Sequence, residues 1–188
     1  MYNRIKSIID LFFAILGLIV LSPFILLVAI IQLLDFKNAF FIQRRPGLNA
    51  TIFKMIKFRT LKIEGDDSSV TWFGSLLRKT SFDEVPQLIN ILKGEMSFIG
   101  PRPLLVEYLK GYSDRQSKRH NVKPGITGLA QVSGRNKLSW EDSLELDVQY
   151  VENISFLMDL KISIKSIFQL FKFSEVDGLN GKNREPFI

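Results

Sequence analysis

The stretch LFFAILGLIVLSPFILLVAIIQLL, residues 11–34, decides how this chain folds. It carries no charge between Asp10 and Asp35. As a straight helix it is about 36 Å long, which exceeds the roughly 30 Å of a bilayer's hydrocarbon core. A secretory signal peptide has an apolar region of only about 7–15 residues, followed by a small-x-small cleavage site. The stretch is too long and lacks such a site, so it predicts a membrane anchor.

A Ser22-Pro23 pair at the midpoint makes the topology of this anchor an open question. Proline removes a backbone donor and crowds the preceding turn, so it kinks or breaks a helix. The apolar halves, 11–21 and 24–34, each reach roughly 16 Å, about one leaflet. Basic residues occur on both flanks, which favours both ends on the cytoplasmic side. These features favour a re-entrant helix that enters and leaves by one face, while a simple transmembrane span stays possible.

Length and charge limit what the rest of the chain can be. The 188 residues suffice for an anchor and one domain. We expect an anchor at 1–36, a catalytic domain at 37–174 and a polar tail at 175–188. The net charge of +6 fits nucleic acid, an anionic lipid surface or a phosphorylated substrate. The anchor favours the last two, and no nucleic acid is expected. The lack of cysteine and the single His120 exclude disulfides, thiolate metal sites and multi-histidine centres.

Residue patterns after the anchor predict an α+β chain that is mainly helical. Short strands are expected at 40–42 and 52–58, a turn at 45–49, a polar loop at 64–71, and helices at 74–79, 82–93, 104–119, 140–150 and 153–173. The last helix interleaves lysines with a broad apolar face. Such a helix can lie in a membrane interface or pack into a core, and both interpretations stay open.

Asp83 and Glu84 are the strongest candidates for chemistry. Ser81 and Glu84 match a capping box, which places both acids in the first turn of the helix at 82–93. The helix dipole there favours ionised carboxylates. An ionised aspartate can attack phosphorus, and a second carboxylate can bind Mg²⁺. Ordinary capping by acidic residues is the alternative.

Four polar residues are candidates for binding phosphate or nucleotide. Prolines on both sides fix the backbone of Arg102, which presents a guanidinium fork suited to phosphate. Arg78 precedes the acidic pair, Gln87 lies one turn after Asp83, and Arg135 falls in a glycine-rich stretch. For any one of these basic residues taken alone, a solvated surface role is the better interpretation.

Several blocks of sequence together resemble one family. They are LSPFILL (21–27), RPGL (45–48), KFRT (57–60), SFDEVPQLINILKGEMSFIGPRPLLVEY (81–108), RH (119–120), KPGITGLAQVSGRN (123–136), ELDVQYV (145–151) and SFLMDLKI (155–162). The chain resembles the small monotopic phosphoglycosyl transferases, which start bacterial glycoconjugate assembly on a polyprenyl phosphate. Within them it is most similar to the Campylobacter-type enzymes that transfer phospho-N,N′-diacetylbacillosamine. The resemblance covers nearly the whole chain.

The resemblance implies a fold and a reaction. The fold is a re-entrant helix broken at Ser22-Pro23, amphipathic interfacial helices and a small catalytic region, held on the cytoplasmic face of the bacterial inner membrane. Asp83 would attack the β-phosphate of a UDP-sugar, release UMP and keep the phosphosugar, which polyprenyl phosphate then accepts. Glu84, with Asp83, would bind Mg²⁺. The residues matching phosphate or nucleotide contacts are Arg78, Gln87, Arg102 and Arg135.

Other functions and partners are also consistent with these residues. A non-catalytic basic membrane scaffold would need no acidic dyad, and a UDP-sugar hydrolase would release UMP without a lipid acceptor. The resemblance suggests an N-acetylated amino sugar as the transferred group. A homodimer is permitted by the basic amphipathic faces but is not required by them.

Overall fold

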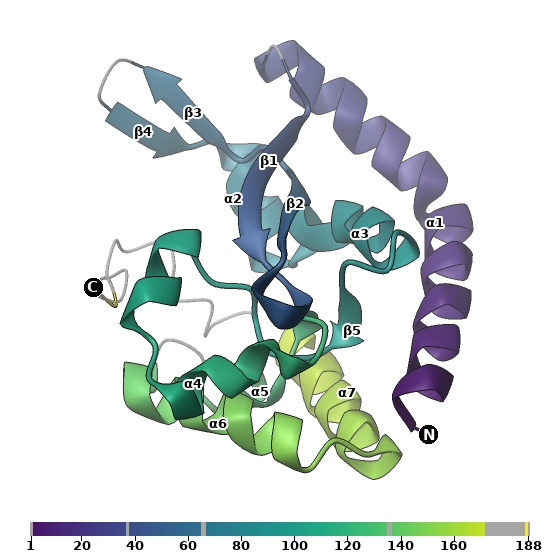
Figure 1. Cartoon of the computed structure of the whole chain (residues 1–188). Coiled ribbons are helices and arrows are strands. Elements are labelled where there is room, and N and C mark those ends of the chain that lie inside the picture. The colour runs from purple at the N-terminus through teal and green to yellow at the C-terminus, as the bar shows by residue number, and fades with distance from the viewer. Residues whose placement is uncertain (1, 37, 65–66, 135–136, 172–186, 188) are drawn as a thin grey trace.

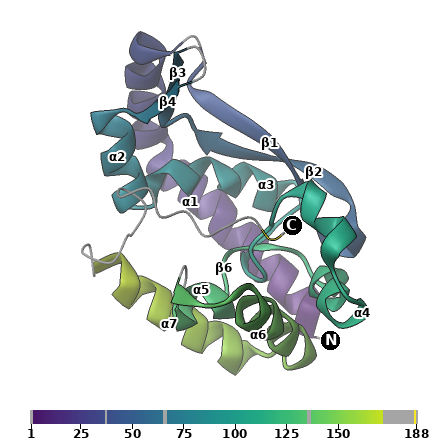
Figure 2. The ribbon, with the colours of Figure 1, turned by 90° about the vertical axis from the view of Figure 1, so that its left-hand side faces the viewer.

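One long helix lies along one side of a body of short helices and strands (Figures 1 and 2). The computed structural model describes residues 2–36, 38–64, 67–134, 137–171 and 187. The elements are α1 (Tyr2–Asp35), β1 (Phe40–Pro46), η1 (Leu48–Ala50), β2 (Ile52–Phe58), β3 (Leu61–Glu64), β4 (Asp67–Val70), α2 (Trp72–Lys79), η2 (Phe82–Gln87), α3 (Leu88–Leu92), β5 (Ser97–Ile99), η3 (Val106–Gly111), α4 (Asp114–Ser117), η4 (Lys118–Asn121), β6 (Gly125–Thr127), α5 (Leu129–Ser133), α6 (Trp140–Glu152) and α7 (Phe156–Phe171). The mainly helical α+β fold class is confirmed.

Helix α1 continues through Pro23. The expectation that the helix is broken at Ser22-Pro23 is therefore wrong. The ribbon bends along its course instead (Figure 1). Proline removes only one backbone donor, and the Ser22 hydroxyl donates to the Ile19 carbonyl oxygen at 2.8 Å. A bend therefore satisfies the local backbone without ending the helix. By length and composition α1 is the one helix of the described residues that could cross a membrane.

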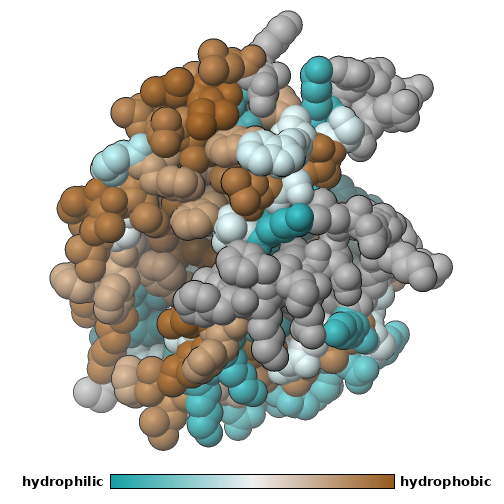
Figure 3. Space-filling model, turned by 180° about the vertical axis from the view of Figure 1, so that it is seen from behind, coloured by the Kyte–Doolittle hydropathy of each residue, from teal (hydrophilic) through white to brown (hydrophobic). Residues whose placement is uncertain are grey.

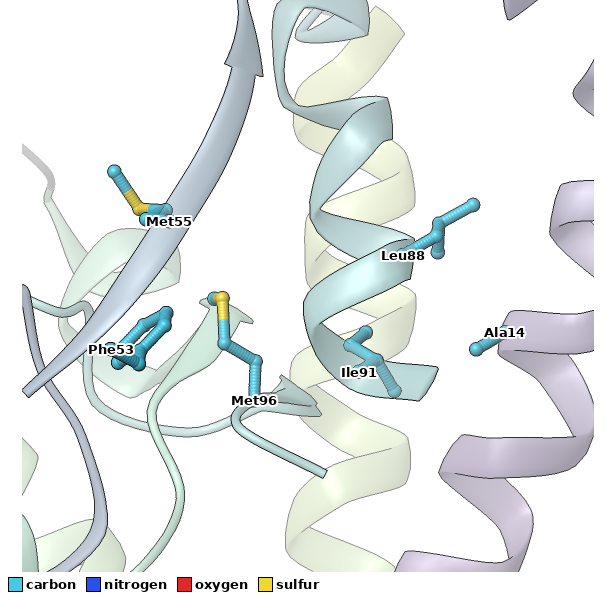
Figure 4. Close-up of a cluster of buried hydrophobic side chains, with 6 residues drawn as sticks. All are labelled: Ala14, Phe53, Met55, Leu88, Ile91 and Met96. Carbon is cyan, nitrogen blue, oxygen red and sulfur yellow. The ribbon is translucent and has the colours of Figure 1, made fainter. Parts of the chain in front are cut away.

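Both halves of α1 pack against the body. In the first half, Ala14 is fully buried and faces Leu88 and Ile91 of α3 (Figure 4). In the second half, Val28 packs with Phe58 and Leu77 in a separate core cluster. Figure 4 also shows Phe53, Met55 and Met96 on the side of α3 that faces away from α1, and these three side chains belong to the same core cluster. The long helix is thus fastened along its length rather than by one end.

The strands form three two-stranded units. β1 and β2 are antiparallel with Phe40 opposite Phe58, which confirms the predicted strands, and the turn between them places Asn49 at a positive φ of 52°. The polar loop expected at 64–71 is partly wrong, because β4 pairs with β3. This hairpin projects from the body in Figure 1, where polar strand residues need no buried face. β5 and β6 are parallel, with Ser97 opposite Gly125.

Two predicted helices are each divided in the structure. The helix expected at 82–93 begins as the 3₁₀ helix η2, which contains Pro86, and only then becomes α3. The helix expected at 104–119 is interrupted after Gly111. There Ser113 starts α4 with a capping box to Gln116, so local capping outweighs the amphipathic pattern.

An exposed apolar surface follows α1 and continues on α7 (Figure 3). On α1 the side chains of Ile8, Phe12 and Leu26 are more than three-fifths exposed. On α7, Ile162 is buried whereas Leu157 and Phe168 are each 66% exposed. Helix α7 therefore combines the two interpretations left open by its sequence, since one face packs into the core and another presents apolar side chains outward.

Candidate active site

The acidic pair lies at the start of η2, and a left-handed residue places it there. Ser81, with φ 59° and ψ 14°, turns the chain out of α2, and its carbonyl oxygen accepts a hydrogen bond from the Glu84 backbone N–H at 3.2 Å. The predicted capping box is wrong, because the Ser81 side chain makes no cap hydrogen bond. The Glu84 side chain instead points toward cations.

Glu84 accepts two cationic donors on one oxygen. Its Oε1 lies 2.6 Å from Lys57 Nζ and 2.9 Å from Arg102 Nη2. The Glu84 and Lys57 side chains are 12% and 16% exposed, whereas Arg102 is 45% exposed and open to a ligand. Burial alone would raise the pKa of Glu84, but the charges of Arg102 and Lys57 lower it to about 2. Glu84 is therefore ionised at neutral pH.

Asp83 differs from its neighbour in its proton affinity. Burial, followed by the charge of Glu84, raises the pKa of Asp83, while Lys57, Arg102 and Arg78 act against that rise. The expectation that a helix dipole keeps Asp83 acidic is wrong in direction, because η2 is a six-residue 3₁₀ helix and desolvation dominates. A raised pKa makes the ionised carboxylate the more basic nucleophile.

Arg78 enters the site from the last turn of α2. Its Nε donates to Thr60 Oγ1 at 2.8 Å, which fixes the guanidinium. Helix α2 can approach Thr60 because Gly74 has no side chain: a Cβ there would lie 2.5 Å from the Thr60 carbonyl oxygen. The charge of Arg78 acts on Asp83, which places its guanidinium near the dyad, and its contact with phosphate or nucleotide stays a prediction.

The loop that carries Arg102 is held by Arg119 of η4, and α6 supports the contact through Asp147 and Tyr150. Arg119 Nη2 donates to the Arg102 carbonyl oxygen at 2.6 Å, and the same guanidinium forms a 2.7 Å ion pair with Asp147. The hydroxyl of Tyr150, one turn further along α6, donates to the Ile99 carbonyl oxygen at 3.2 Å. Two hydrogen bonds, one to Arg102 itself and one to Ile99 at the end of β5, therefore fix the backbone from which Arg102 presents its guanidinium.

The other predicted site residues have different outcomes. Gln87 is buried, and its contact with phosphate or nucleotide stays a prediction. Arg135 lies outside the described residues. Lys57 is the functional residue that sequence reasoning did not select. It shares the inward face of β2 with Phe53 and Met55, and a lysine on a buried strand face was the available signal.

The residues present fit a magnesium ion. Mg²⁺ is commonly held by one or two carboxylates together with substrate phosphates. Asp83 and Glu84 are two adjacent carboxylates, and only one oxygen of Glu84 is engaged by the cations. Among the described residues, no group of three or more metal-binding side chains exists that would hold a metal without substrate.

An acidic pair surrounded by three cations, beside a long apolar helix, is typical of enzymes that handle phosphates next to a membrane. The profile of the bacterial sugar transferase family matches residues 1–173. The chain therefore belongs to the bacterial sugar transferase family, and it is a transferase.

Individual relatives are similar over most of this chain. The uncharacterized sugar transferase EpsL of Bacillus subtilis is 44% identical over 192 residues, covering 97% of this chain and 95% of the relative. The exopolysaccharide production protein ExoY of Sinorhizobium fredii is 39% identical, covering 86% of this chain and 83% of the relative. The UDP-glucose:undecaprenyl-phosphate glucose-1-phosphate transferase of Escherichia coli is 36% identical, covering 90% of this chain but 41% of the relative.

Proposed function

We propose that this protein transfers a phosphosugar from a UDP-sugar to polyprenyl phosphate and releases UMP, with Asp83 as the covalent carrier. The observation that carries the proposal is the unequal acidic pair. Glu84 is held ionised by Lys57 and Arg102, while the neighbouring Asp83 has a raised pKa and lies in the same positive field. Such a field stabilises the charge on a transferring phosphoryl group.

The reaction proceeds in two displacements at phosphorus. An Asp83 carboxylate oxygen bonds to the β-phosphorus of the UDP-sugar, the bond from that phosphorus to the bridging oxygen breaks, and UMP leaves with the electron pair. The phosphosugar stays on Asp83 as an acyl phosphate. An oxygen of polyprenyl phosphate then bonds to the same phosphorus, and the Asp83 carboxylate leaves. The product is a polyprenyl diphosphate sugar.

Each cation of the site has a role in this scheme. Arg102, the most exposed of the three, binds the incoming diphosphate, and Lys57 keeps Glu84 ionised and in place. Arg78, fixed by Thr60, offsets negative charge on the Asp83 side. Asp83 and Glu84 would hold Mg²⁺, which when bound neutralises phosphate charge further.

The membrane arrangement that we propose is re-entrant, with the catalytic body on the cytoplasmic face of the bacterial inner membrane. A spanning helix would carry one of its halves away from the body. Here Lys6, near one end of α1, is paired with Asp159 of α7 at 2.6 Å, and Val28 in the other half is buried against Phe58. The exposed apolar faces of α1 and α7 would then meet lipid, and Asp83 would meet a lipid phosphate at headgroup depth.

The sugar is proposed from the resemblance and from the relatives. An N-acetylated amino sugar, such as N,N′-diacetylbacillosamine, is the first candidate, and its transfer would be the first membrane step of glycoconjugate synthesis. The name of the Escherichia coli relative favours UDP-glucose as the second candidate donor. Initial rates with UDP-N-acetylglucosamine, UDP-N,N′-diacetylbacillosamine and UDP-glucose at equal concentrations separate the two classes.

One assay tests the reaction class: UMP release in the presence and absence of polyprenyl phosphate. The proposal predicts at most one equivalent of UMP per protein without the lipid, and continuous release with it. Continuous release without lipid identifies a UDP-sugar hydrolase. Salt-sensitive vesicle binding with no release in either arm identifies a membrane scaffold.

A further inference from the structure

Three aromatic side chains surround the ring of Phe187 close to the active site. The ring centroid of Phe187 lies 5.6 Å from Tyr108, 5.5 Å from Tyr112 and 5.6 Å from Trp140. Tyr108 and Trp140 also meet each other edge to face, with centroids 5.5 Å apart. We call Tyr108, Tyr112 and Trp140 the ring cage. The tail at 175–188 was expected to be a polar appendage, and within it Phe187 is docked into this cage.

A single guanidinium links the ring cage to the catalytic loop. Arg119 lies over the Tyr112 ring at 5.6 Å from its centroid, and Nη1 donates to the Tyr112 hydroxyl at 3.3 Å. Through Nη2 the same group donates to the Arg102 carbonyl oxygen at 2.6 Å. The cage is therefore next to Arg102, the cation that contacts Glu84, and the buried side chain of Arg119 lies between the two.

A second cation, Arg45, lies near both the cage and Arg102. Arg45 donates from Nη2 to Gln43 Oε1 at 2.6 Å, while its buried Nε has no partner among the described residues. Burial and the positive charge of Arg102 lower the pKa of Arg45 to about 10. Tyr108 and Tyr112 are among the groups close enough to influence the pKa of Arg45. Two close cations and a vacant donor are what a diphosphate would neutralise.

An unpartnered acceptor borders the cage as well. His120 Nδ1 is 3.3 Å from the Gly47 carbonyl oxygen, which can only accept, so the ring proton is on Nδ1. Burial, with the charge of Arg119, lowers the pKa of His120 to about 4, so the ring is neutral near pH 7. Its buried Nε2 then carries a lone pair and has no partner in the part of the chain that the structure describes. The N3–H group of uracil is a donor for such an atom.

We propose that the ring cage binds the uracil base of the nucleotide, and that Phe187 occupies this place when no nucleotide is bound. The order of groups fits a UDP-sugar: aromatic rings for the base, Arg45 and Arg102 for the diphosphate, then Asp83 at the β-phosphorus. Phe187 and the base compete, so the chain carries its own weak inhibitor of donor binding. This inference rests on the proposed function, because that function supplies the uridine nucleotide.

The test is a direct titration of the full-length protein in detergent micelles with UMP, which requires no turnover. Stacking of a base on an aromatic ring contributes about 1–3 kcal/mol. We therefore expect Tyr108→Leu to weaken UMP binding at least about fivefold, whereas Tyr108→Phe, which keeps the ring, stays within twofold of wild type. We expect Phe187→Ala to tighten UMP binding severalfold. Trp72→Leu removes an exposed tryptophan of α2 and serves as the control with unchanged affinity.

Titration with a second ligand distinguishes the contribution of the base to binding from that of the phosphate. Ribose 5-phosphate lacks a base, so its affinity should be the same in wild type, Phe187→Ala and Tyr108→Leu. Unchanged or weaker UMP binding in Phe187→Ala would overturn the competition, and equal UMP binding in Tyr108→Leu and Tyr108→Phe would overturn the cage as base site. If the UMP pattern holds but no phosphosugar forms on Asp83, only the proposed reaction fails. If the adduct forms without the UMP pattern, only the cage assignment fails.

Discussion

Two buried ion-pair sites in this chain have opposite designs. At the dyad, one carboxylate faces two cations, a second carboxylate lies beside it, and Arg102 is 45% exposed. At the support beneath it, Arg119 and Asp147 pair one to one with side chains only 1% and 4% exposed. The Arg119–Asp147 pair is sealed from solvent, its two charges match, and it fixes the position of the backbone at Arg102. A partly open group with more positive than matched negative charge is prepared for an anionic ligand.

The largest expected effect is the loss of catalysis in Asp83→Asn, because the amide cannot act as the nucleophile. We expect turnover to fall by more than about 1,000-fold, a loss of at least about 4 kcal/mol in transition-state stabilisation. The thermal unfolding midpoint should stay equal or rise, since burial disfavours the charge of Asp83 in the folded state. The measurements are UMP release with polyprenyl phosphate and a melting curve in detergent.

Asp114→Asn is the matched control for this variant. Asp114 is also a first-turn acid, in α4, but it is exposed. It should keep wild-type turnover. Substantial activity in Asp83→Asn would remove the dyad from the catalytic role and make both ion-pair sites structural.

At the sealed pair, the substitution Asp147→Asn should mainly lower the unfolding free energy, whereas Asp83→Asn should mainly lower turnover. This change leaves Arg119 buried without its counter-charge, and breaking a buried pair typically costs about 3–5 kcal/mol of unfolding free energy. Denaturant unfolding in detergent measures the loss. The exposed pair of Arg115 with Glu145 joins the same helix α6, so Arg115→Ala is the control with no measurable change. A stable Asp147→Asn protein would contradict the distinction between the two sites.

Arg102→Ala sharpens the comparison through its pH dependence. Arg102 is the foremost of the groups that lower the pKa of Glu84 to about 2, so its removal should raise that pKa toward the ordinary 4.5. The lowered pKa of Glu84 stabilises the folded protein above about pH 4.5, and this stabilisation is lost as the pH falls toward 2. In Arg102→Ala this contribution to the unfolding free energy becomes smaller. Activity should drop about 100-fold, and the acidic limb of the pH–rate profile should move to higher pH.

Arg102→Lys keeps the positive charge and should move the acidic limb less than Arg102→Ala does. Arg102 also lowers the pKa of Asp83, so an acidic limb at the wild-type position in Arg102→Ala would mean that Arg102 does not control the ionisation of the dyad.

The smallest effect concerns His120, which follows Arg119 of the sealed pair, lies with its ring centroid 5.7 Å from that of Tyr112, and is the only histidine in the chain. Its pKa is lowered from 6.5 to about 4, so in an NMR titration the single imidazole should titrate near pH 4. Because the folded pKa is depressed, the unfolded chain binds the proton first, and stability falls as pH drops from about 6.5 to about 4. Titration near pH 6.5 would show that His120 is exposed, and would remove the acceptor beside the ring cage.

The sequence identified the candidate site residues better than it identified the side chains that contact and support them. Asp83, Glu84, Arg78 and Arg102 were found from local motifs, because helix starts and proline-fixed loops are visible in consecutive residues. Lys57 was not selected, because its partner Glu84 is 27 positions away and only the folded hairpin brings the two together. Asp147 and Arg119 act through the backbone of Arg102, and no local pattern marks such a contact.

The same limit explains the errors in the fold. The strand at 52–58 and the helix α6 were predicted from local residue patterns, whereas the strand predicted at 40–42 extends to Pro46, into the segment where a turn was expected. Helix 104–119 was divided by a cap at Ser113 that a long amphipathic pattern hides. At Pro23 the helix bends and does not break, because the Ser22 hydroxyl donates one hydrogen bond to the backbone and both halves of α1 pack against the body.

Mass spectrometry of the intact protein tests the central claim most directly. The protein is incubated with UDP-sugar and Mg²⁺ in the absence of polyprenyl phosphate, and the modified residue is then mapped by peptide fragmentation. We expect a mass increase equal to one phosphosugar, located on Asp83, that disappears when polyprenyl phosphate is added. Lipid-dependent turnover with an unmodified Asp83, or with the phosphosugar on another residue, would contradict it.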